Sequence, residues 1–208
     1  MNEIDVITEE TYTFAEMFDR TVKCALWLRQ QGIKANDVVA LCAPNIMDNS
    51  VPFFATFCVG AIFTPWNFSM DIYGARYFMI LSGAKIVFAD ESSVSTILKA
   101  AKLDNNDIKV VVFDKASNAL PFSKVLKGHS KSDLENFECA QNDIHDTAAL
   151  LYSSGSTGLP KGVITSHFSL LYTLTIPNGF KVEKIPLCMS GYFWISRVIF
   201  FTLHSKRR

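Results

Sequence analysis

The sequence predicts an α/β fold in which a layered, parallel sheet is flanked by helices, and two observations carry this prediction. Apolar runs of strand length begin at positions 38, 61, 85 and 109, so successive runs are 23, 24 and 24 residues apart. None of them alternates with polar residues, which is typical of strands buried on both faces of a parallel sheet. Each step has room for one strand and one crossover helix, the repeating unit of such a sheet.

The first predicted helix begins with a capping box, because Thr13 and Glu16 can each satisfy an unpaired backbone N–H there. Apolar residues follow at steps of three and four up to Gly32, which we expect to end the helix. A strand over residues 38–42 comes next and stops before Pro44. Helices and strands are then expected in alternation: helix 48–59, strand 61–64, helix 71–82, strand 86–89, helix 92–103 and strand 109–113.

The composition is that of a chain that folds around a core. Of its 208 residues, 49% are hydrophobic and 19% are charged, which excludes the disordered and fibrous classes. The 20 Lys and Arg residues balance the 20 Asp and Glu residues. This neutrality removes the electrostatic argument for a nucleic-acid or membrane-surface partner, so we expect no nucleic acid among the partners.

The most apolar stretch, residues 51–70, has nearly the length of a membrane-spanning helix. Pro52, Gly60 and Pro65 interrupt it, and we interpret it as a buried helix followed by a buried strand. No membrane span is therefore expected. The periodic pattern fades over residues 114–146, which we interpret as a polar surface connection with one short helix.

A segment rich in glycines and hydroxyl groups follows a predicted strand over residues 147–152. Residues 153–162 hold four hydroxyls, three glycines and one lysine. Glycines let successive N–H groups approach an anion, hydroxyls donate further hydrogen bonds, and lysine adds a compact positive charge. A polyphosphate requires these groups, but a polar turn between two strands has the same composition. Both interpretations stay open on composition alone.

The segment does not fit the Walker A loop of kinases and GTPases. Counted from Gly155, the position of the second required glycine is Pro160. Lys161 also opens no long helix in the sequence pattern. Both departures argue against a nucleotide-binding protein of that class.

The run from Tyr152 to Val163 resembles the phosphate-binding signature of the AMP-forming adenylating superfamily, which includes acyl-CoA synthetases, 4-coumarate–CoA ligases and beetle luciferases. His167 lies where these proteins usually have a histidine. Residues 43–45 and 60–67 resemble the N-terminal half of the superfamily, nearest to its luciferase-like and 4-coumarate–CoA ligase-like branch. The resemblance covers residues 11–194 and implies part of the large N-terminal domain of an adenylate-forming enzyme. Residues 195–208 are then a basic tail.

The resemblance also implies a two-step reaction. A carboxylic acid attacks the α-phosphate of ATP, with Mg²⁺, to give an acyl-adenylate and pyrophosphate, and the thiol of CoA then displaces AMP. Lys161 is expected to stabilise the phosphate charge, with Ser154 and Thr157 as the preferred hydroxyl donors. The residues expected to bind ATP are Ser153, Ser154, Gly155, Ser156, Thr157, Gly158, Lys161, Gly162 and His167.

Two departures from the superfamily pattern limit what the resemblance implies. Many relatives have a histidine in the segment that corresponds to residues 186–194, and none is present here. The adenine-binding, ribose-binding and hinge motifs and the C-terminal lysine have no counterpart after Trp194. We therefore expect an incomplete form of the ligase that lacks full activity.

The remaining signals concern metals, redox state and compartment. The four histidines have no shared ligand spacing, so no metal site is expected. The five cysteines form no Cys-x-x-Cys pair and are expected to be reduced and mostly buried. Without a visible targeting segment we expect an intracellular protein, cytoplasmic by default. A peroxisomal location fits the resemblance, but the terminal Ser-Lys-Leu signal of some relatives is not present.

Three hypotheses follow from the sequence. The first is an acid–thiol ligase of the AMP-forming type. The second is a short, non-catalytic isoform that binds polyphosphate or associates with a full-length relative. The third is an incomplete gene model. The acid that would be activated is not readable from these residues.

Overall fold

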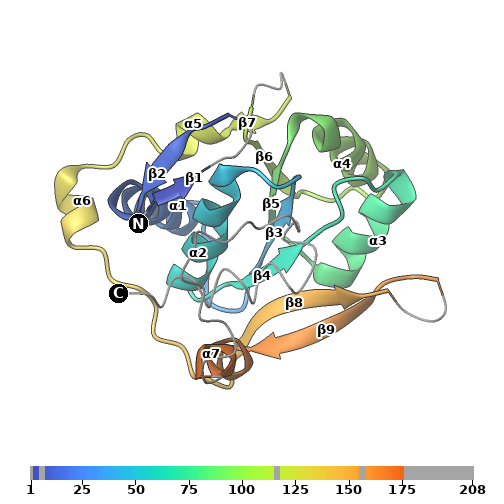
Figure 1. Ribbon diagram of the computed structural model, residues 1–208. Helices are drawn as coiled ribbons and strands as arrows, with labels where there is room; N and C mark the ends of the chain where they lie inside the picture. The colour runs from blue at the N-terminus through green and yellow to red at the C-terminus, as the bar shows by residue number, and fades with distance from the viewer. Residues whose placement is uncertain (1, 5–7, 115–117, 155–157, 176–208) are drawn as a thin grey trace.

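The computed structural model describes residues 2–4, 8–114, 118–154 and 158–175 (Figure 1). A sheet of seven strands lies at its centre, in the order β7-β6-β5-β3-β4-β8-β9. The strands are β3 (Val38–Cys42), β4 (Ile62–Pro65), β5 (Ile86–Ala89), β6 (Lys109–Val112), β7 (Leu120–Pro121), β8 (Thr147–Ser153) and β9 (Lys161–Ser166). Every neighbouring pair is parallel except β8 and β9, which are antiparallel. The predicted α/β fold is thus confirmed, with an antiparallel edge strand added.

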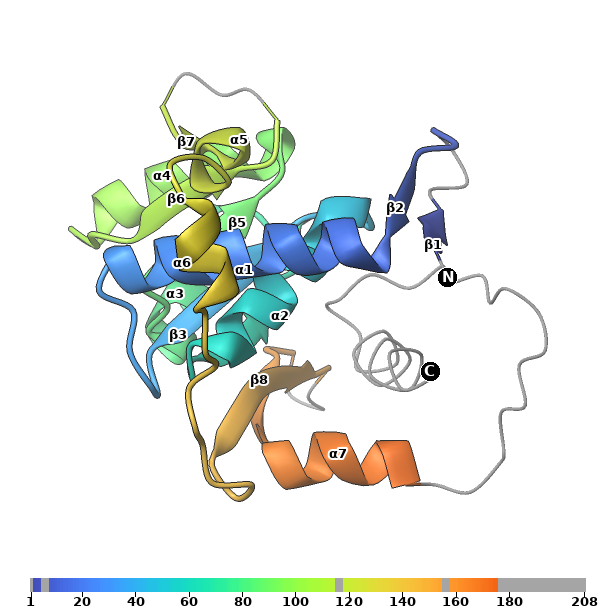
Figure 2. The same cartoon turned by 90° about the vertical axis from the view of Figure 1, so that its left-hand side faces the viewer.

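Helices cover both faces of this sheet, with α1 (Phe14–Gln30) and α2 (Ser50–Cys58) together and α3 (Ile72–Ser82) and α4 (Glu91–Leu103) together (Figures 1 and 2). Shorter elements complete the chain: β1 (Asn2–Ile4), β2 (Thr11–Thr13), η1 (Met47–Asn49), α5 (Phe122–Val125), α6 (Lys131–Glu135) and α7 (His167–Thr175). β1 and β2 pair as a separate antiparallel ribbon.

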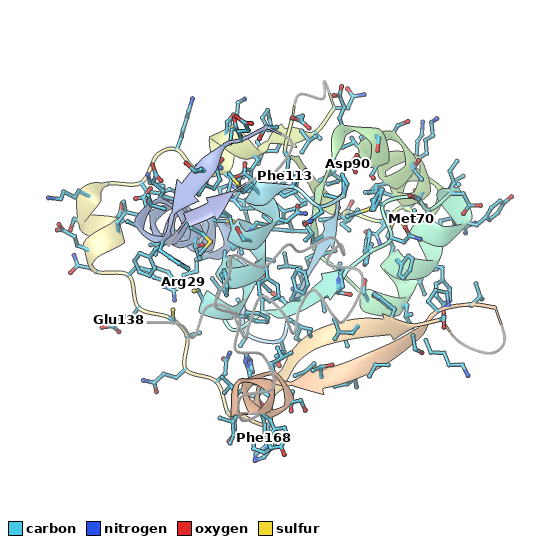
Figure 3. All side chains as sticks on the ribbon, viewed as in Figure 1. Arg29, Met70, Asp90, Phe113, Glu138 and Phe168 are labelled. Atoms are coloured by element: carbon cyan, nitrogen blue, oxygen red, sulfur yellow. The ribbon has the colours of Figure 1, made fainter. Side chains whose placement is uncertain are left out.

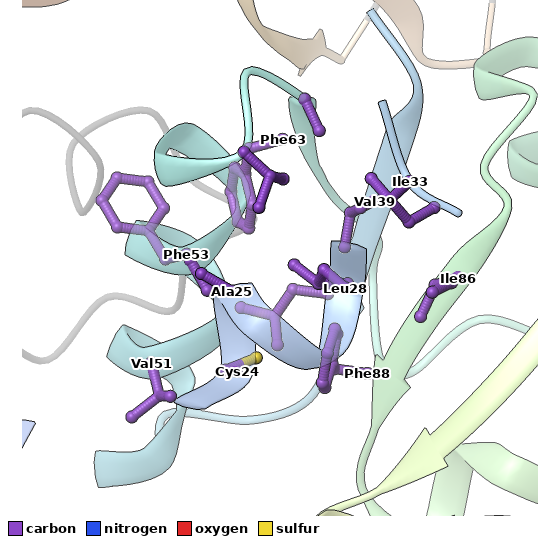
Figure 4. Close-up of a cluster of buried hydrophobic side chains, with 14 of the residues drawn as sticks. Cys24, Ala25, Leu28, Ile33, Val39, Val51, Phe53, Phe63, Ile86 and Phe88 are labelled. Atoms are coloured by element: carbon purple, nitrogen blue, oxygen red, sulfur yellow. The ribbon is translucent and has the colours of Figure 1, made fainter. Parts of the chain in front are cut away.

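Two hydrophobic clusters fill the space between the helices and the sheet. Val39 and Leu41 of β3 belong to the cluster with α1 and α2, whereas Val38 and Ala40 belong to the cluster with α3 and α4. Figure 4 shows the first cluster, to which Leu28, Phe88 and Val39 all belong. Successive side chains of a strand point to opposite faces. The absence of polar alternation in the sequence therefore reflects a sheet covered on both sides.

The ends of the helices follow the signals in the sequence. The backbone N–H of Glu16 donates to Thr13 Oγ1 at 3.2 Å, and the N–H of Thr13 donates to Glu16 Oε2 at 2.8 Å. This confirms the capping box at the start of α1. Gly83 ends α3 with a φ of 61°, in the left-handed region that favours glycine.

The apolar stretch 51–70 divides into α2 and β4, as expected. Phe53 of α2 and Phe63 of β4 are both 1% exposed, and their rings meet edge-on at 4.9 Å. Within the described residues, no helix is long and apolar enough to cross a membrane.

The connection over residues 114–146 is more structured than its polar composition indicates. β7 extends the sheet by pairing with β6, and α5 buries Phe122 and Val125 in the cluster beside α1. A second short helix, α6, follows. The prediction of a surface connection with one short helix is therefore wrong here. Two buried side chains three residues apart are too few to give a periodic signal.

Candidate phosphate-binding hairpin

The glycine-rich segment forms the tip of the hairpin between β8 and β9. Ser153 pairs with Lys161 and Tyr152 with Gly162, so the two strands stay together up to the ends of the segment. Figure 1 shows this hairpin extending outward below α3. Ser153, Ser154, Gly158, Lys161 and Gly162 are exposed at the tip. Gly155, Ser156 and Thr157 lie outside the described residues, so the expected cradle of N–H groups stays a prediction.

The stem of the hairpin is held by a buried polar contact with β4. Thr64 is fully buried, and its hydroxyl donates to the carbonyl of Leu150 at 3.0 Å. Tyr152 Oη lies 2.8 Å from Thr64 Oγ1 and is the donor, because the Thr64 hydrogen is already used. Phe78 of α3 packs edge-on against the Tyr152 ring at 4.7 Å. The residue that leads into the tip is thus fixed on two sides.

The return of the chain is held by α3. Tyr77 Oη donates to the carbonyl of Pro160 at 2.6 Å, immediately before Lys161. Gly158 has a φ of 98°, a backbone conformation that L side chains rarely adopt. Glycine is therefore required at this position of the tip on backbone grounds alone. Both ends of the tip are fixed by tyrosines that the sheet and α3 position.

The electrostatics of the stem follow from burial. Desolvation raises the pKa of Tyr152, so its phenol stays protonated and keeps donating to Thr64 near neutral pH. Lys161 begins β9 and is exposed. In the described part of the chain its ammonium makes no ion pair. Its charge is therefore available to an anion that binds the tip.

The structure does not bring His167 together with the tip. His167 begins α7, and its backbone N–H donates to the carbonyl of Asp146, at the opposite end of the hairpin. At about 3.4 Å per residue, the six residues of β9 separate it from Lys161 by about 20 Å. Asn142 Nδ2 donates to its Nε2 at 3.3 Å, and Phe57 packs edge-on against its ring at 5.9 Å. Burial lowers the pKa of His167, while Asp146 opposes this shift.

Sequence reasoning missed the two residues outside the segment that position it. Thr64 lies at the end of an apolar strand, where a buried hydroxyl gives no signal of its partner. Tyr77 lies on a helix, where its spacing does not distinguish a surface tyrosine from one that reaches a distant carbonyl. Residues 186–194, the segment without the expected histidine, and the basic tail 195–208 lie outside the described residues.

Comparisons with known proteins agree on one family. The model of the AMP-binding enzyme family matches residues 3–205. A 4-coumarate–CoA ligase from Nicotiana tabacum is 30% identical over 199 residues, which is 92% of this chain and 36% of that protein. Luciferin 4-monooxygenase from Photinus pyralis is 27% identical over 172 residues, which is 78% of this chain and 31% of that protein. The chain thus spans about a third of the length of these relatives.

Solved structures that resemble this fold come from the same kinds of enzyme. The structure of the luciferase-like enzyme from the nonluminescent Zophobas morio mealworm matches with a TM-score of 0.77 and 30% identity, over 82% of this chain and 40% of that one. A benzoate–CoA ligase from Burkholderia xenovorans matches in fold alone, with a TM-score of 0.67 and 20% identity. These findings confirm the resemblance drawn from residues 152–163. The chain belongs to the AMP-binding enzyme family.

Proposed function

We propose that this chain provides the triphosphate-binding part of an AMP-forming acid–thiol ligase. Such an enzyme activates a carboxylic acid with ATP and passes the acyl group to CoA. Family membership and the likeness to 4-coumarate–CoA ligases support the proposal. The observation that carries it is the hairpin, which presents hydroxyls, glycines and the charge of Lys161, unpaired among the described residues, at one exposed tip.

The tip would act on the β- and γ-phosphates, which leave together as pyrophosphate. The acid's carboxylate oxygen forms a bond to the α-phosphorus while the bond from that phosphorus to the pyrophosphate oxygen breaks. Negative charge grows on the leaving group, and Lys161 would offset it. Ser154 and Thr157 would donate hydrogen bonds to the same oxygens, with Ser153, Gly155, Ser156, Gly158 and Gly162 shaping the backbone around them.

The chemistry of these residues fits the magnesium salt of ATP as the substrate. The described residues contain no group of three or more His, Cys, Asp or Glu side chains that could hold a metal. By resemblance to the family, Mg²⁺ would arrive with the phosphates of the substrate and would share the charge that Lys161 faces. Beside the exposed apolar side chain of Leu159, the described residues at the tip offer hydroxyls, backbone groups and a cation, which are the groups that bind an anion.

Isothermal titration with inorganic pyrophosphate and with magnesium ATP tests the proposal. Lys161→Ala should weaken binding by about tenfold or more, because a hydrogen bond to a charged group is worth about 1.5–3 kcal/mol. Lys99→Ala, at an exposed lysine of α4, is the matched control and should leave the affinity unchanged. Equal affinity of the wild-type and Lys161→Ala proteins would contradict the proposal.

A second candidate is a non-catalytic form that associates with a full-length relative. The observation that favours it is the apolar exposure of the hairpin edge and of α7. Ile164 is 73% exposed and Tyr172 is 60% exposed, with Val163, Phe168 and Leu171 also exposed nearby. ATP–pyrophosphate exchange with a panel of fatty and aromatic acids separates the candidates. Exchange by this chain alone favours the enzyme, whereas no exchange by this chain, together with its co-elution with a full-length relative in size-exclusion chromatography, favours association.

A further inference from the structure

Two cysteines that are far apart in the sequence lie together beside α7. Cys58 is the last residue of α2 and is half-buried, whereas Cys139 is exposed in the segment that precedes β8. The backbone N–H of Ala140 donates to the carbonyl of Cys58 at 2.9 Å. Both cysteines also line one cavity, together with His167 and Leu171 of α7. The backbone contact and the shared cavity thus bring the two cysteines together.

The segment that contains Cys139 is fixed against the turn after α2. Gly60 has a φ of 75°, and a Cβ on it would lie 2.7 Å from Asn142 Oδ1 and 3.2 Å from Ala140 Cβ. A side chain at position 60 would therefore push this segment away. The segment can approach the end of α2 closely because position 60 is a glycine.

Arg29 of α1 holds the same segment from its other end. Its guanidinium lies over the Phe137 ring at 4.6 Å and donates to the carbonyl of Glu138. Figure 3 shows Arg29 and Glu138 next to each other. The guanidinium also acts on Cys58, because its charge favours the thiolate and partly opposes the effect of burial. The pair of thiols therefore lies close to a fixed cation.

The two thiols differ in reactivity and in access. Burial, reinforced by the neighbouring Cys139, raises the pKa of Cys58 to about 12. Cys58 is thus protonated at neutral pH, and the exposed Cys139 is the thiol that meets a reagent first. A cavity of about 310 Å³ opens at this point, and its lining includes both cysteines, His167 and Leu171. A small reagent can therefore approach the pair from solvent.

We propose that Cys58 and Cys139 form a reversible disulfide by exchange with a small-molecule disulfide such as oxidised glutathione. The Cys139 thiolate attacks one sulfur of the reagent, and the reagent's other half leaves as a thiolate. The Cys58 thiol then loses its proton and displaces the second half, which forms the Cys58–Cys139 bond. The two protein thiols lose two electrons and two protons in total, and the reagent is reduced to two thiols.

The proposed bond would tie the end of α2 to the segment that leads into β8. Cys58 and Cys139 lie 81 positions apart in the sequence (139 − 58). A cross-link over so long a loop restricts the unfolded chain strongly, so the oxidised protein should melt at a higher temperature than the reduced one. The difference should disappear on addition of dithiothreitol.

Non-reducing peptide mapping of the whole 208-residue chain tests the proposal. The protein is incubated with oxidised glutathione, its remaining thiols are alkylated, and the peptides are identified by mass spectrometry. We expect a linked peptide pair that contains Cys58 and Cys139, and an intact mass lower than that of the reduced protein by about 2 Da, because two hydrogens leave. A stable glutathione adduct on Cys139 without this link, or a link from Cys139 to another cysteine, would overturn the proposal.

Two variants and one unfolded control sharpen the test. Cys139→Ser should abolish the link, whereas Cys188→Ser should leave it in place. In concentrated urea the wild-type chain should lose its preference for this pair, because the contacts that bring Cys139 to Cys58 are then gone. Circular dichroism confirms that each variant is folded. If one is not, the wild-type maps with and without urea still decide the outcome.

Discussion

The two halves of the sheet, the buried half around β3 and β5 and the hairpin of β8 and β9, differ in how much of their side chains is exposed. β3 and β5 are buried at every residue, whereas the first four residues of β9 are exposed and none of the six is buried. β3 and β5 gain stability from apolar contacts on both faces, and their side chains are apolar apart from the thiol of Cys42. The strand β9 of the hairpin buries much less of its side chains than β3 and β5 do. The tip of this hairpin presents polar and charged residues to solvent.

Side-chain hydrogen bonds connect the two halves. Thr64 of the inner strand β4 binds β8 through Leu150 and Tyr152, and Tyr77 of α3 binds the chain just before Lys161. The hairpin therefore depends on the buried half for its position. Stability and ligand binding should then respond differently to changes in the two regions.

The largest expected effect comes from a cavity in the buried half. Phe88 is fully buried and meets Trp27 and Phe122 edge-on. Phe88→Ala should lower the free energy of unfolding by about 3–5 kcal/mol. Ile164→Ala on β9, where the side chain is 73% exposed, should lower it by less than about 1 kcal/mol. Urea denaturation of both variants measures the contrast, and equal losses would refute the distinction between the two halves.

A smaller effect is expected where the two halves meet. Tyr152→Phe removes the hydrogen bond to Thr64 but keeps the ring against Phe78. The free energy of unfolding should fall by about 1 kcal/mol. Tyr73→Phe, at a tyrosine that is 77% exposed on α3, serves as the matched control and should change nothing measurable. A Tyr152→Phe protein as stable as the wild type would show that this contact does not hold the stem.

The smallest effect is a dependence of stability on pH through His167. Burial lowers the pKa of His167 in the folded state, so the unfolded chain binds a proton more readily. The stability that neutral His167 supplies is complete above the unfolded value of about 6.5. It is lost as the pH falls through the lower folded value. His167→Gln should therefore lose less stability than the wild type between pH 7.5 and 5.5, as followed by urea denaturation. Identical slopes would contradict this assignment.

The sequence predicts the buried half better than the connections to the hairpin. Val38–Cys42 is identified to the residue, because five consecutive apolar residues leave few alternatives for a chain of this composition. The capping box at Thr13 and Glu16 is equally readable, since both partners lie within one helical turn. Such local signals depend on neighbours in the chain.

What could not be predicted depends on contacts between distant residues. The bond between Tyr77 and Pro160 joins residues 83 positions apart, and that between Thr64 and Tyr152 joins residues 88 positions apart. The distance between His167 and the tip likewise follows from β9, which runs back along β8 from Lys161 to Ser166. The resemblance to the superfamily groups His167 with the segment, and the sequence alone does not show that the extended strand β9 separates the two.

The central claim is that the tip of the hairpin is the part of the chain that binds polyphosphate. Titration of ¹⁵N-labelled protein with inorganic pyrophosphate, followed by amide chemical shifts, tests it most directly. We expect saturable shifts that are largest over residues 153–162 and small over β3 and β5. Shifts that are absent there, or that are largest beside α7 and Cys58, would contradict it.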